Sequence, residues 1–177
     1  MRHLEPLSTK LRLRCPVSKL AAYAACYPLE VDADVEIGVA PEARRRGFLS
    51  KPQFLRLAGW KTPRSRPRCE KNDAAFVEEV TRNVLASRNE RFKIESLRLL
   101  QGVDWPTASV ILHFCDEQPY PVLDVRALWS VGVPRPRYGF EFWSDYVAFT
   151  RALAAKARLS MRTLDRALWQ YSKEKQA

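Results

Sequence analysis

The amino-acid sequence predicts an all-α protein, a compact fold built from many helices. Apolar side chains recur at helical spacing in several segments, as expected for helices that bury one face. No segment is a convincing strand of a sheet, and 46% of the residues are hydrophobic, with five Trp, six Tyr and eight Phe. We therefore expect one domain over residues 1–177, or two intimate helical lobes that share a core and hold the site between them.

The first part of the chain predicts two helices and an acidic connection. Residues 15–28, CPVSKLAAYAACYP, indicate a short apolar helix bounded by prolines. Residues 29–40 alternate apolar and acidic side chains, which predicts an extended or short helical connection. Residues 49–61 predict a helix with Ser50 as its N-cap. The acidic connection is expected to present a solvated face formed by Asp32, Asp34 and Glu36.

The next segments predict a loop and two further helices. Residues 62–73, TPRSRPRCEKND, are rich in proline and arginine and have no periodicity, so we expect a loop. Asn72 or Asp73 then caps a helix that carries four apolar side chains on one face, Phe76, Val77, Val80 and Val84. Residues 89–100 predict a helix with three inward side chains, Phe92, Leu97 and Leu100.

The second half of the chain is predicted to be helical throughout. Gly102 breaks the preceding helix, and residues 105–115 form a nearly all-apolar helix. Residues 125–131 and 138–157 predict two more helices. The last helix, residues 160–175, shows apolar spacing of i, i+3, i+4 and i+7 at Leu164, Ala167, Leu168 and Tyr171. We therefore expect seven or eight helices in all.

The charge of the chain is strongly basic. The formal net charge is +10, from 30 Lys plus Arg against 20 Asp plus Glu. Arginine predominates, and guanidinium groups suit phosphate oxygens, so the charge fits a polyanionic partner or simply a basic surface. No apolar run has the length of a bilayer span, and the N-terminus lacks the apolar core of a signal peptide. We expect a cytoplasmic protein without a membrane partner.

Cysteine and histidine give no sign of a metal centre. We expect His113, inside an apolar helix, to be a hydrogen-bonded core histidine rather than a base, and His3 to lie in a frayed terminus. Neither a metal nor a cofactor is implied. The cysteines are too widely spaced for a zinc or iron–sulfur motif and predict buried free thiols, at Cys15, Cys26, Cys69 and Cys115.

The stretch LLQGVDWPTA predicts a tight hairpin between two helices. Gly102 can adopt the positive φ that ends a helix. Asp104 is placed to cap the next helix, and Pro106 falls in its first turn, where a missing N–H costs nothing. Free amides and the positive end of a helix dipole favour an anion such as phosphate. An ordinary helical hairpin is the alternative interpretation.

A carboxylate follows this hairpin at a characteristic separation. Asp124 stands in the apolar run PVLDVRALW, about twenty residues after the pattern Leu-x-Gly-Val-x-x-x-Thr-Ala. The combination resembles the helix-hairpin-helix DNA glycosylases, the superfamily of endonuclease III and alkyl-adenine repair enzymes. The resemblance covers residues 89–132, and its hairpin positions are Leu100, Gly102, Val103, Thr107 and Ala108.

The resemblance implies a role for Asp124. In this family the matching aspartate is catalytic and lies at the mouth of the pocket that receives the base. The chain is also similar to uncharacterised bacterial relatives of this superfamily that carry a Trp-Lys-x-Pro-Arg stretch, here residues 60–64. The protein is therefore expected to be a monomer that binds double-stranded DNA with a damaged or modified base, associated with the nucleoid.

Three departures from the family pattern narrow the expected activity. Asp104 replaces a hairpin glycine and brings a negative charge to a position that approaches phosphate. Pro106 replaces the lysine that bifunctional members use to form a Schiff base, so strand nicking is not expected. The cysteine cluster of the iron–sulfur members is also missing. The remaining pattern is that of a monofunctional glycosylase.

The chemistry implied by the resemblance suits an aspartate at this position. Cleavage of an N-glycosidic bond passes through a transition state with oxocarbenium character, which a carboxylate stabilises while it orients or deprotonates water. The N-terminus of a helix favours the charged form of Asp124. The competing interpretation is that Asp124 only caps the helix from Val125, and both roles are compatible.

Binding and base flipping need basic side chains and an aromatic pocket. Four basic side chains near the stretch at 60–64 could meet phosphate, namely Lys61, Arg64, Arg66 and Arg68, and Arg126 lies closer to the aspartate. The competing interpretation is that these charges are solvated or paired with acidic neighbours. The aromatic candidates for the base pocket are Trp60, Trp105, Tyr120 and Trp129, although aromatic side chains between helices more often belong to a core.

Two alternatives to a glycosylase remain open. The chain could be a non-catalytic helix-hairpin-helix DNA-binding protein, in which Asp124 is only a cap. It could also be a scaffold that keeps the fold and binds a protein or a small nucleoside, which the charge of Asp104 would favour. A nuclease is not expected, because no cluster of carboxylates suits two-metal chemistry.

Overall fold

The computed structural model describes residues 11–176, and the expectation for His3 falls outside them. Within these residues the chain forms α-helices and short 3-10 helices without a β-strand, so the all-α prediction is confirmed. Over residues 11–176 the helices are more numerous and shorter than predicted, with eleven α-helices, α1 to α11, and four 3-10 helices, η1 to η4. None of the helices in this part of the chain combines the length and the apolar character needed to cross a bilayer.

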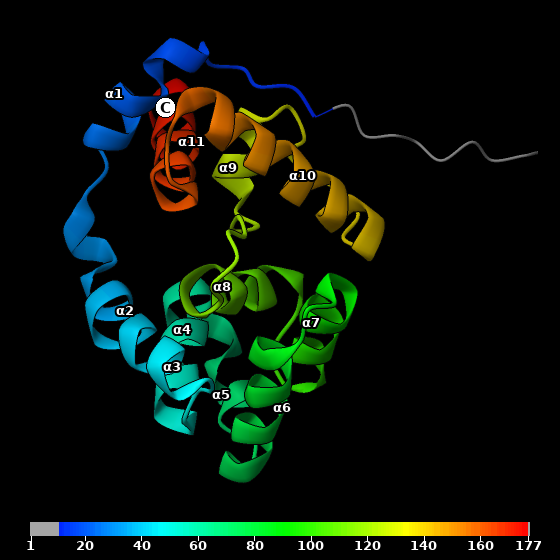
Figure 1. The fold of residues 1–177 in the computed structure, drawn as a ribbon. Coiled ribbons are helices and arrows are strands. Elements are labelled where there is room, and N and C mark those ends of the chain that lie inside the picture. Colours follow the sequence, from blue (N-terminus) through cyan, green and yellow to red (C-terminus); the bar gives the residue numbers. More distant parts are fainter. Residues whose placement is uncertain (1–10, 177) are drawn as a thin grey trace, which may run out of the picture.

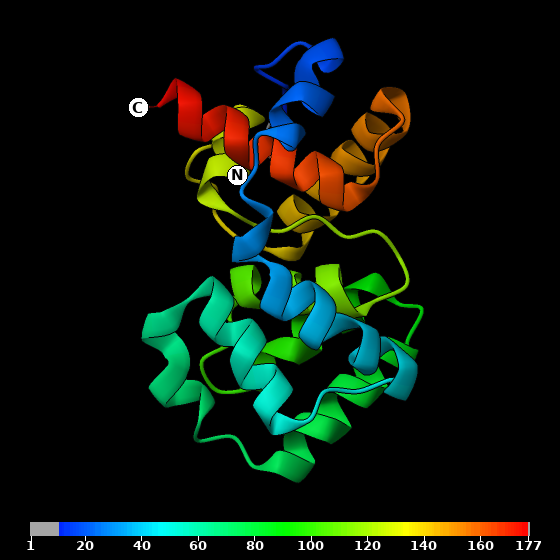
Figure 2. The ribbon, with the colours of Figure 1, turned by 90° about the vertical axis from the view of Figure 1, so that its left-hand side faces the viewer.

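The helices are arranged in two lobes that lie one above the other (Figures 1 and 2). We call the upper one the terminal lobe, because it combines the two ends of the described chain. It contains η1 (Val17–Lys19), α1 (Leu20–Ala25), α9 (Val125–Ser130), α10 (Phe140–Ala157) and α11 (Met161–Lys175). Helices α1 and α9 pack mainly on α11.

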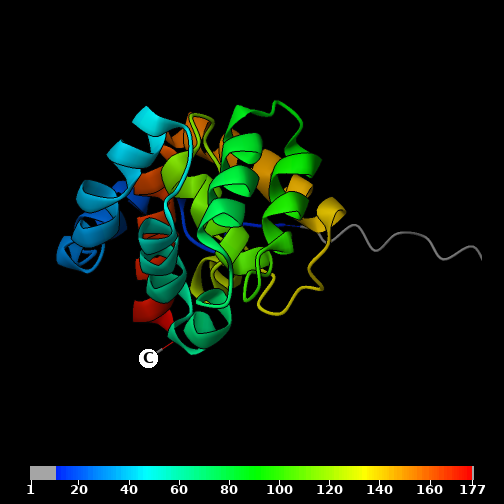
Figure 3. The same cartoon turned by 90° about the horizontal axis from the view of Figure 1, so that it is seen from below.

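The second lobe, the middle lobe, is built from the intervening chain. Figure 3 shows its cyan-to-green helices in front of the orange and red helices of the terminal lobe. The apolar side chains buried in both lobes form one continuous cluster. The elements of the middle lobe are η2 (Leu29–Val31), α2 (Ala33–Gly38), α3 (Ala40–Arg46), α4 (Lys51–Lys61), η3 (Pro63–Ser65), α5 (Arg66–Cys69), α6 (Ala74–Ala86), α7 (Glu90–Ser96), η4 (Leu97–Leu99) and α8 (Trp105–Cys115).

Several predicted helix starts are confirmed. Ser50 is the N-cap of α4, and its backbone N–H donates to Gln53 Oε1 at 3.0 Å. Of the two candidates for the cap of α6, Asp73 accepts hydrogen bonds from the first-turn amides. The connection over residues 29–40 takes the short helical form, as η2 and α2. Local side-chain chemistry therefore determines these starts.

The predicted loop over residues 62–73 is wrong, because η3 and α5 form there. Pro63 and Pro67 lie in the first turns of these two helices, where proline fixes a helical φ and its missing N–H costs no hydrogen bond. A proline-rich stretch without apolar periodicity therefore still folds into two short helices.

Three expectations about burial are also wrong. The Phe92 side chain is 45% exposed, because the change from α7 to η4 aligns Ile94, Leu97 and Leu100 at a spacing of three on the buried side. Phe76, at the start of α6, is 40% exposed, whereas Val77, Val80 and Val84 are buried as predicted. Cys26 is exposed, whereas the other three cysteines are buried free thiols.

A segment over residues 116–124, the crossing segment, leads from α8 to α9 and joins the middle lobe to the terminal lobe (Figure 2). At its start, Lys93 Nζ lies 2.5 Å from Asp116 Oδ2 in a buried ion pair. Near its end, the Leu123 N–H donates to Ser109 Oγ of α8 at 2.8 Å. Because both ends are fixed to the middle lobe, the crossing segment delivers Asp124 to the junction of the lobes.

Candidate functional site

The hairpin before α8 has the geometry that the sequence predicts. Gly102 has a φ of 83°, in the left-handed region that favours glycine. The Val103 N–H donates to the Leu100 carbonyl at 3.1 Å, which closes the turn. Asp104 is the N-cap of α8 and accepts from the Trp105 N–H at 2.8 Å. Its carboxylate also pairs with Arg98, which offsets the negative charge at this position.

The hairpin is held against α5 by a buried amide. Asn72 donates from Nδ2 to the Gln101 carbonyl at 2.9 Å and accepts from the Gln101 N–H at 2.8 Å. A Cβ on Gly102 would lie 2.6 Å from Cys69 Sγ and 2.9 Å from the Cys69 backbone nitrogen. Glycine is therefore required at position 102 both by the backbone conformation and by the close approach of α5.

Asp124 caps α9 and also forms an ion pair across the junction of the lobes. Its Oδ1 accepts from the Arg126 N–H at 2.8 Å, and its Oδ2 lies 2.7 Å from Lys61 Nζ. Lys61 is the last residue of α4, in the middle lobe, whereas α9 belongs to the terminal lobe. The side chain of Lys61 is 11% exposed and that of Asp124 is 23% exposed. Each carboxylate oxygen has a partner, yet the group remains accessible.

The access is a pocket of about 200 Å³ at the junction of the lobes. Helix α4 supplies Trp60 and Lys61, and α11 supplies Asp165 and Trp169. The lining is completed by Tyr27, Val31, Val122 and Asp124. The volume is below the roughly 300–1,000 Å³ of pockets for drug-sized ligands. The pocket suits a single small ring system rather than an extended molecule.

Three aromatic side chains form walls of this pocket. Tyr27 and Trp169 meet edge to face, with ring centroids 5.2 Å apart. Trp60 packs edge to face on Phe114, with centroids 5.3 Å apart, and its Nε1–H donates to Asp32 Oδ1 at 3.2 Å. Aromatic faces of this kind are suited to stacking a planar ring.

An ionic cluster adjoins the pocket and joins α11 to α2. Arg162 pairs with Asp32, with Glu36 at 2.6 Å and with Asp165 at 3.0 Å. Arg166 reaches Glu36 at 2.6 Å and Asp32 at 3.6 Å. The expected solvated acidic face is therefore wrong for Asp32, which is fully buried, and Glu36 is half-buried in ion pairs. Their partners lie more than a hundred residues away in the sequence.

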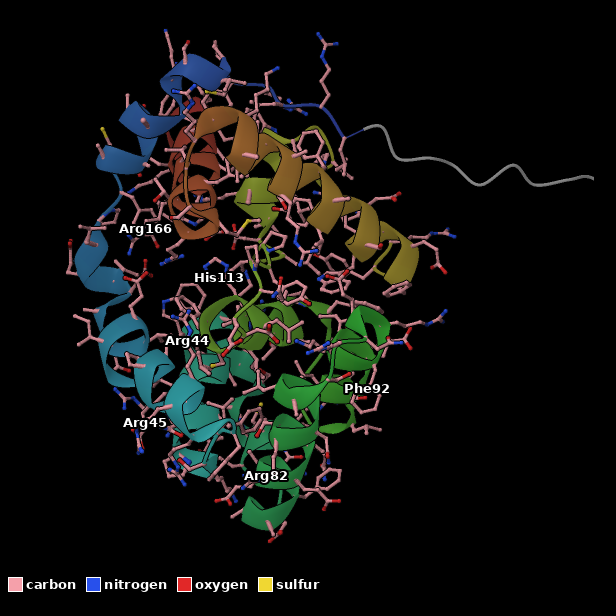
Figure 4. The ribbon with its side chains drawn as sticks, in the orientation of Figure 1. Arg44, Arg45, Arg82, Phe92, His113 and Arg166 are labelled. Carbon is pink, nitrogen blue, oxygen red and sulfur yellow. The ribbon has the colours of Figure 1, made fainter. Side chains whose placement is uncertain are left out.

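His113 is buried in α8 where the middle lobe faces the terminal lobe (Figure 4). Its Nδ1 lies 2.6 Å from the Tyr120 carbonyl, so Nδ1 carries the proton, and its buried Nε2 has no partner in the described chain. Burial, with a smaller contribution from the charge of Arg162, lowers the pKa of His113 to about 3. The histidine is neutral at ordinary pH, and it does not line the pocket.

The predicted pocket aromatics are only partly brought together. Trp60 lines the pocket with Asp124, but Trp105, Tyr120 and Trp129 do not. Trp105 is buried with Arg98 over its ring, and Tyr120 is buried in a stack with Trp143. Trp129 packs near Tyr171 and carries Arg14 over its ring.

The predicted basic residues fall into two groups. Arg64, Arg66 and Arg68 are exposed on η3 and α5, next to the hairpin residue Gly102, and Arg66 pairs with Glu70. Arg126 lies nearer the pocket, with its guanidinium over the Trp169 ring at 5.4 Å. Lys61 lies inside the pocket. Of the remaining hairpin positions, Val103 and Thr107 are buried.

Among the polar and aromatic residues of the pocket, sequence reasoning missed Tyr27, Asp165 and Trp169. Tyr27 precedes a proline near one end of the described chain, and the other two lie on α11 near the other end. The available signal was on α11, where Asp165 stands beside the apolar stripe. A carboxylate on the buried side of an amphipathic helix indicates a partner or a chemical role.

No group of three or more metal-ligating side chains is formed among residues 11–176. Models of known protein families and curated proteins give no match to the sequence, and no solved structure matches the fold. The resemblance to helix-hairpin-helix glycosylases thus rests on the hairpin and on Asp124.

Proposed function

We propose that the protein hydrolyses the N-glycosidic bond of a damaged or modified base that has been flipped out of duplex DNA. The observation that carries this proposal is the position of Asp124, which is accessible at a small aromatic pocket and is fixed by two donors. A planar base has the size and shape for such a pocket, and stacking on aromatic faces tolerates many bases.

The carboxylate of Asp124 would act on the sugar. It has about four lone-pair sites, and the Arg126 N–H and Lys61 Nζ occupy two of them. The accessible remainder can accept from a water and face the positive charge that develops at C1′ as the bond to the base breaks. Lys61 and the cap fix the orientation of the carboxylate, which is the positioning that such a reaction requires.

The surface around the hairpin would bind the DNA backbone. Exposed Arg64, Arg66 and Arg68 lie on the elements that pack against Gly102, so the basic side chains and the hairpin form one surface. Within the described residues, the backbone N–H groups of Gly102 and Asp104 have no hydrogen-bond partner. Free amides next to guanidinium groups favour phosphate. The net charge of +10 supports the same partner.

A second candidate is a DNA-binding protein in which Asp124 only caps α9. It is favoured by one observation, that both carboxylate oxygens already have partners inside the protein. In that protein the Lys61–Asp124 pair would only join the two lobes, and no base would be released.

The test is incubation of the purified chain with duplexes that each carry one oxidised, alkylated, deaminated or hypermodified base. We expect one class of duplex to acquire alkali-labile sites with release of the free base, and no strand break before alkali. Binding that weakens steeply with salt, without release of any base, would favour the DNA-binding alternative. Absence of DNA binding would contradict both candidates and favour a scaffold for a protein or nucleoside.

A further inference from the structure

The pocket and the adjoining cluster contain more acidic than basic groups. Four carboxylates meet there, those of Asp32, Glu36, Asp124 and Asp165, and three cations face them, those of Lys61, Arg162 and Arg166. All of these side chains are buried or half-buried. If every one of these seven groups were charged, the carboxylates would outnumber their ion-pair partners by one, and an unbalanced charge in a poorly solvated region is costly. One carboxyl group that keeps its proton removes this excess.

The distribution of donors identifies that group. Asp32 accepts from Arg162, from Tyr27 Oη–H at 3.1 Å and from Trp60 Nε1–H at 3.2 Å. Glu36 accepts from both arginines. Asp124 accepts from Lys61 and a backbone N–H.

Asp165 has one donor among the described residues, Arg162 Nη1 at 3.0 Å on its Oδ2. Its other oxygen, Oδ1, accepts no hydrogen bond there, and the residue lines the pocket. The carboxyl group with the fewest donors is the one whose neutral form is favoured.

We propose that Asp165 is the general acid of the pocket, the group that gives a proton to the departing base. This inference rests on the proposed glycosylase function and adds a second residue to it. Asp165 transfers its proton to a ring nitrogen or oxygen of the base while the bond between C1′ and the base breaks and its electron pair stays with the base. Water then adds to C1′ and gives a proton to Asp124, and both carboxyl groups return to their initial states by exchange with solvent.

The surroundings of Asp165 are consistent with this role. Burial raises the pKa of Asp165 to about 6, and the charges of Asp124 and Asp32 act in the same direction, against those of Arg162 and Lys61. Tyr27, Tyr146 and His113 stay neutral nearby, because burial raises the pKa of the two tyrosines and lowers that of the histidine. Two carboxyl groups in one pocket with different environments form the usual arrangement for an acid and an electrostatic partner.

The decisive variant is Asp165→Asn, whose amide oxygen can still accept from Arg162 but which has no acidic proton to donate. The rate at which this variant releases the free base is compared with that of the wild-type protein on two duplexes, one carrying hypoxanthine and one carrying 7-methylguanine. A neutral purine needs a proton to leave, whereas 7-methylguanine already carries a positive charge. Asp145→Asn, at an exposed position of α10, is the matched control.

We expect Asp165→Asn to slow hypoxanthine release by about 100-fold or more and 7-methylguanine release by less than about threefold. Wild-type hypoxanthine release should also fall as the pH rises above about 6, and this dependence should be absent in the variant. Equal losses on both duplexes, or no loss, would overturn the inference and leave the glycosylase proposal intact. A wild-type chain that releases no base from any duplex would overturn both.

A measurement independent of activity uses carbon-13 NMR of the aspartate carboxyl groups. We expect one resonance to titrate near pH 6 in the wild-type protein and to be missing from Asp165→Asn. Titration of that resonance near pH 4 would contradict the inference, because Asp165 would then hold its proton in only about 0.1% of molecules at pH 7, against about 10% for a pKa near 6.

Discussion

Replacement of Gly102 by alanine tests how the hairpin is held. The change places a side chain in a left-handed backbone conformation, which costs an L-residue about 1–2 kcal/mol. The new Cβ would also lie 2.6 Å from Cys69 Sγ and 2.9 Å from the Cys69 nitrogen. Overpacking of this kind costs typically about 1–3 kcal/mol. Alanine also lowers the conformational entropy of the unfolded chain, which offsets roughly 0.4–1 kcal/mol of this cost. We expect a net loss of about 3 kcal/mol in the free energy of unfolding.

Two other glycines separate these contributions. Gly47 has a φ of 73° and open space around a Cβ, so Gly47→Ala should cost only about 1 kcal/mol. Gly59 lies within α4, also with open space, and Gly59→Ala should stabilise by about 0.5–1 kcal/mol. Urea denaturation followed by circular dichroism measures all three variants. If Gly102→Ala lost no more stability than Gly47→Ala, the close contact between the hairpin and α5 would be refuted.

Three further changes test other parts of the fold by the same measurement. Asn72→Ala leaves the N–H and carbonyl of Gln101 without their buried partner and should lower the free energy of unfolding by about 2–4 kcal/mol. A loss below about 1 kcal/mol would contradict a role for this pair of hydrogen bonds in holding the hairpin. Lys93→Met isolates the buried charge of Asp116 and should cost about 3–5 kcal/mol of stability. Much of this loss should be recovered in the double variant that also carries Asp116→Asn, and equal stability of the single and double variants would contradict the prediction. Burial lowers the pKa of His113 to about 3, so between pH 6.5 and 3 the unfolded chain binds a proton that the folded chain does not. The stability that neutral His113 contributes is therefore present above about pH 6.5 and is lost as the pH falls toward 3. His113→Phe should lack this loss of about 1.4 kcal/mol per pH unit, and an unchanged pH dependence would contradict a buried neutral histidine.

The sequence predicts those parts of the structure that depend on neighbours in the chain. The caps at Ser50, Asp73, Asp104 and Asp124 occupy the predicted positions, and so does the positive φ of Gly102. Caps and turns depend on side chains and amides within three or four residues, so their chemistry can be recognised locally. The loop predicted over residues 62–73 fails because proline is compatible with a first helical turn as well as with a loop.

The candidate site is harder to predict because it joins distant segments. Asp32 was expected to be solvated, but Arg162, which lies 130 residues further on, buries it in an ion pair. Lys61 was expected on a phosphate-binding surface, but its partner Asp124 lies across the junction of the lobes. Neither pairing has a local signal, because any arginine or lysine could neutralise a given carboxylate. The packing of the two lobes against each other decides the partners.

The measurement that tests the central claim most directly is release of a free base, detected by mass spectrometry, from the modified duplex on which the wild-type protein is most active. Asp124→Asn can still cap α9 through its side-chain oxygen, and Asp73→Asn makes the same change at the cap of α6, which does not line the pocket. We expect Asp73→Asn to release the base at the wild-type rate. Asp124→Asn should bind the duplex with unchanged affinity and release base at least about 100-fold more slowly. Equal release by the two variants would contradict a chemical role for Asp124.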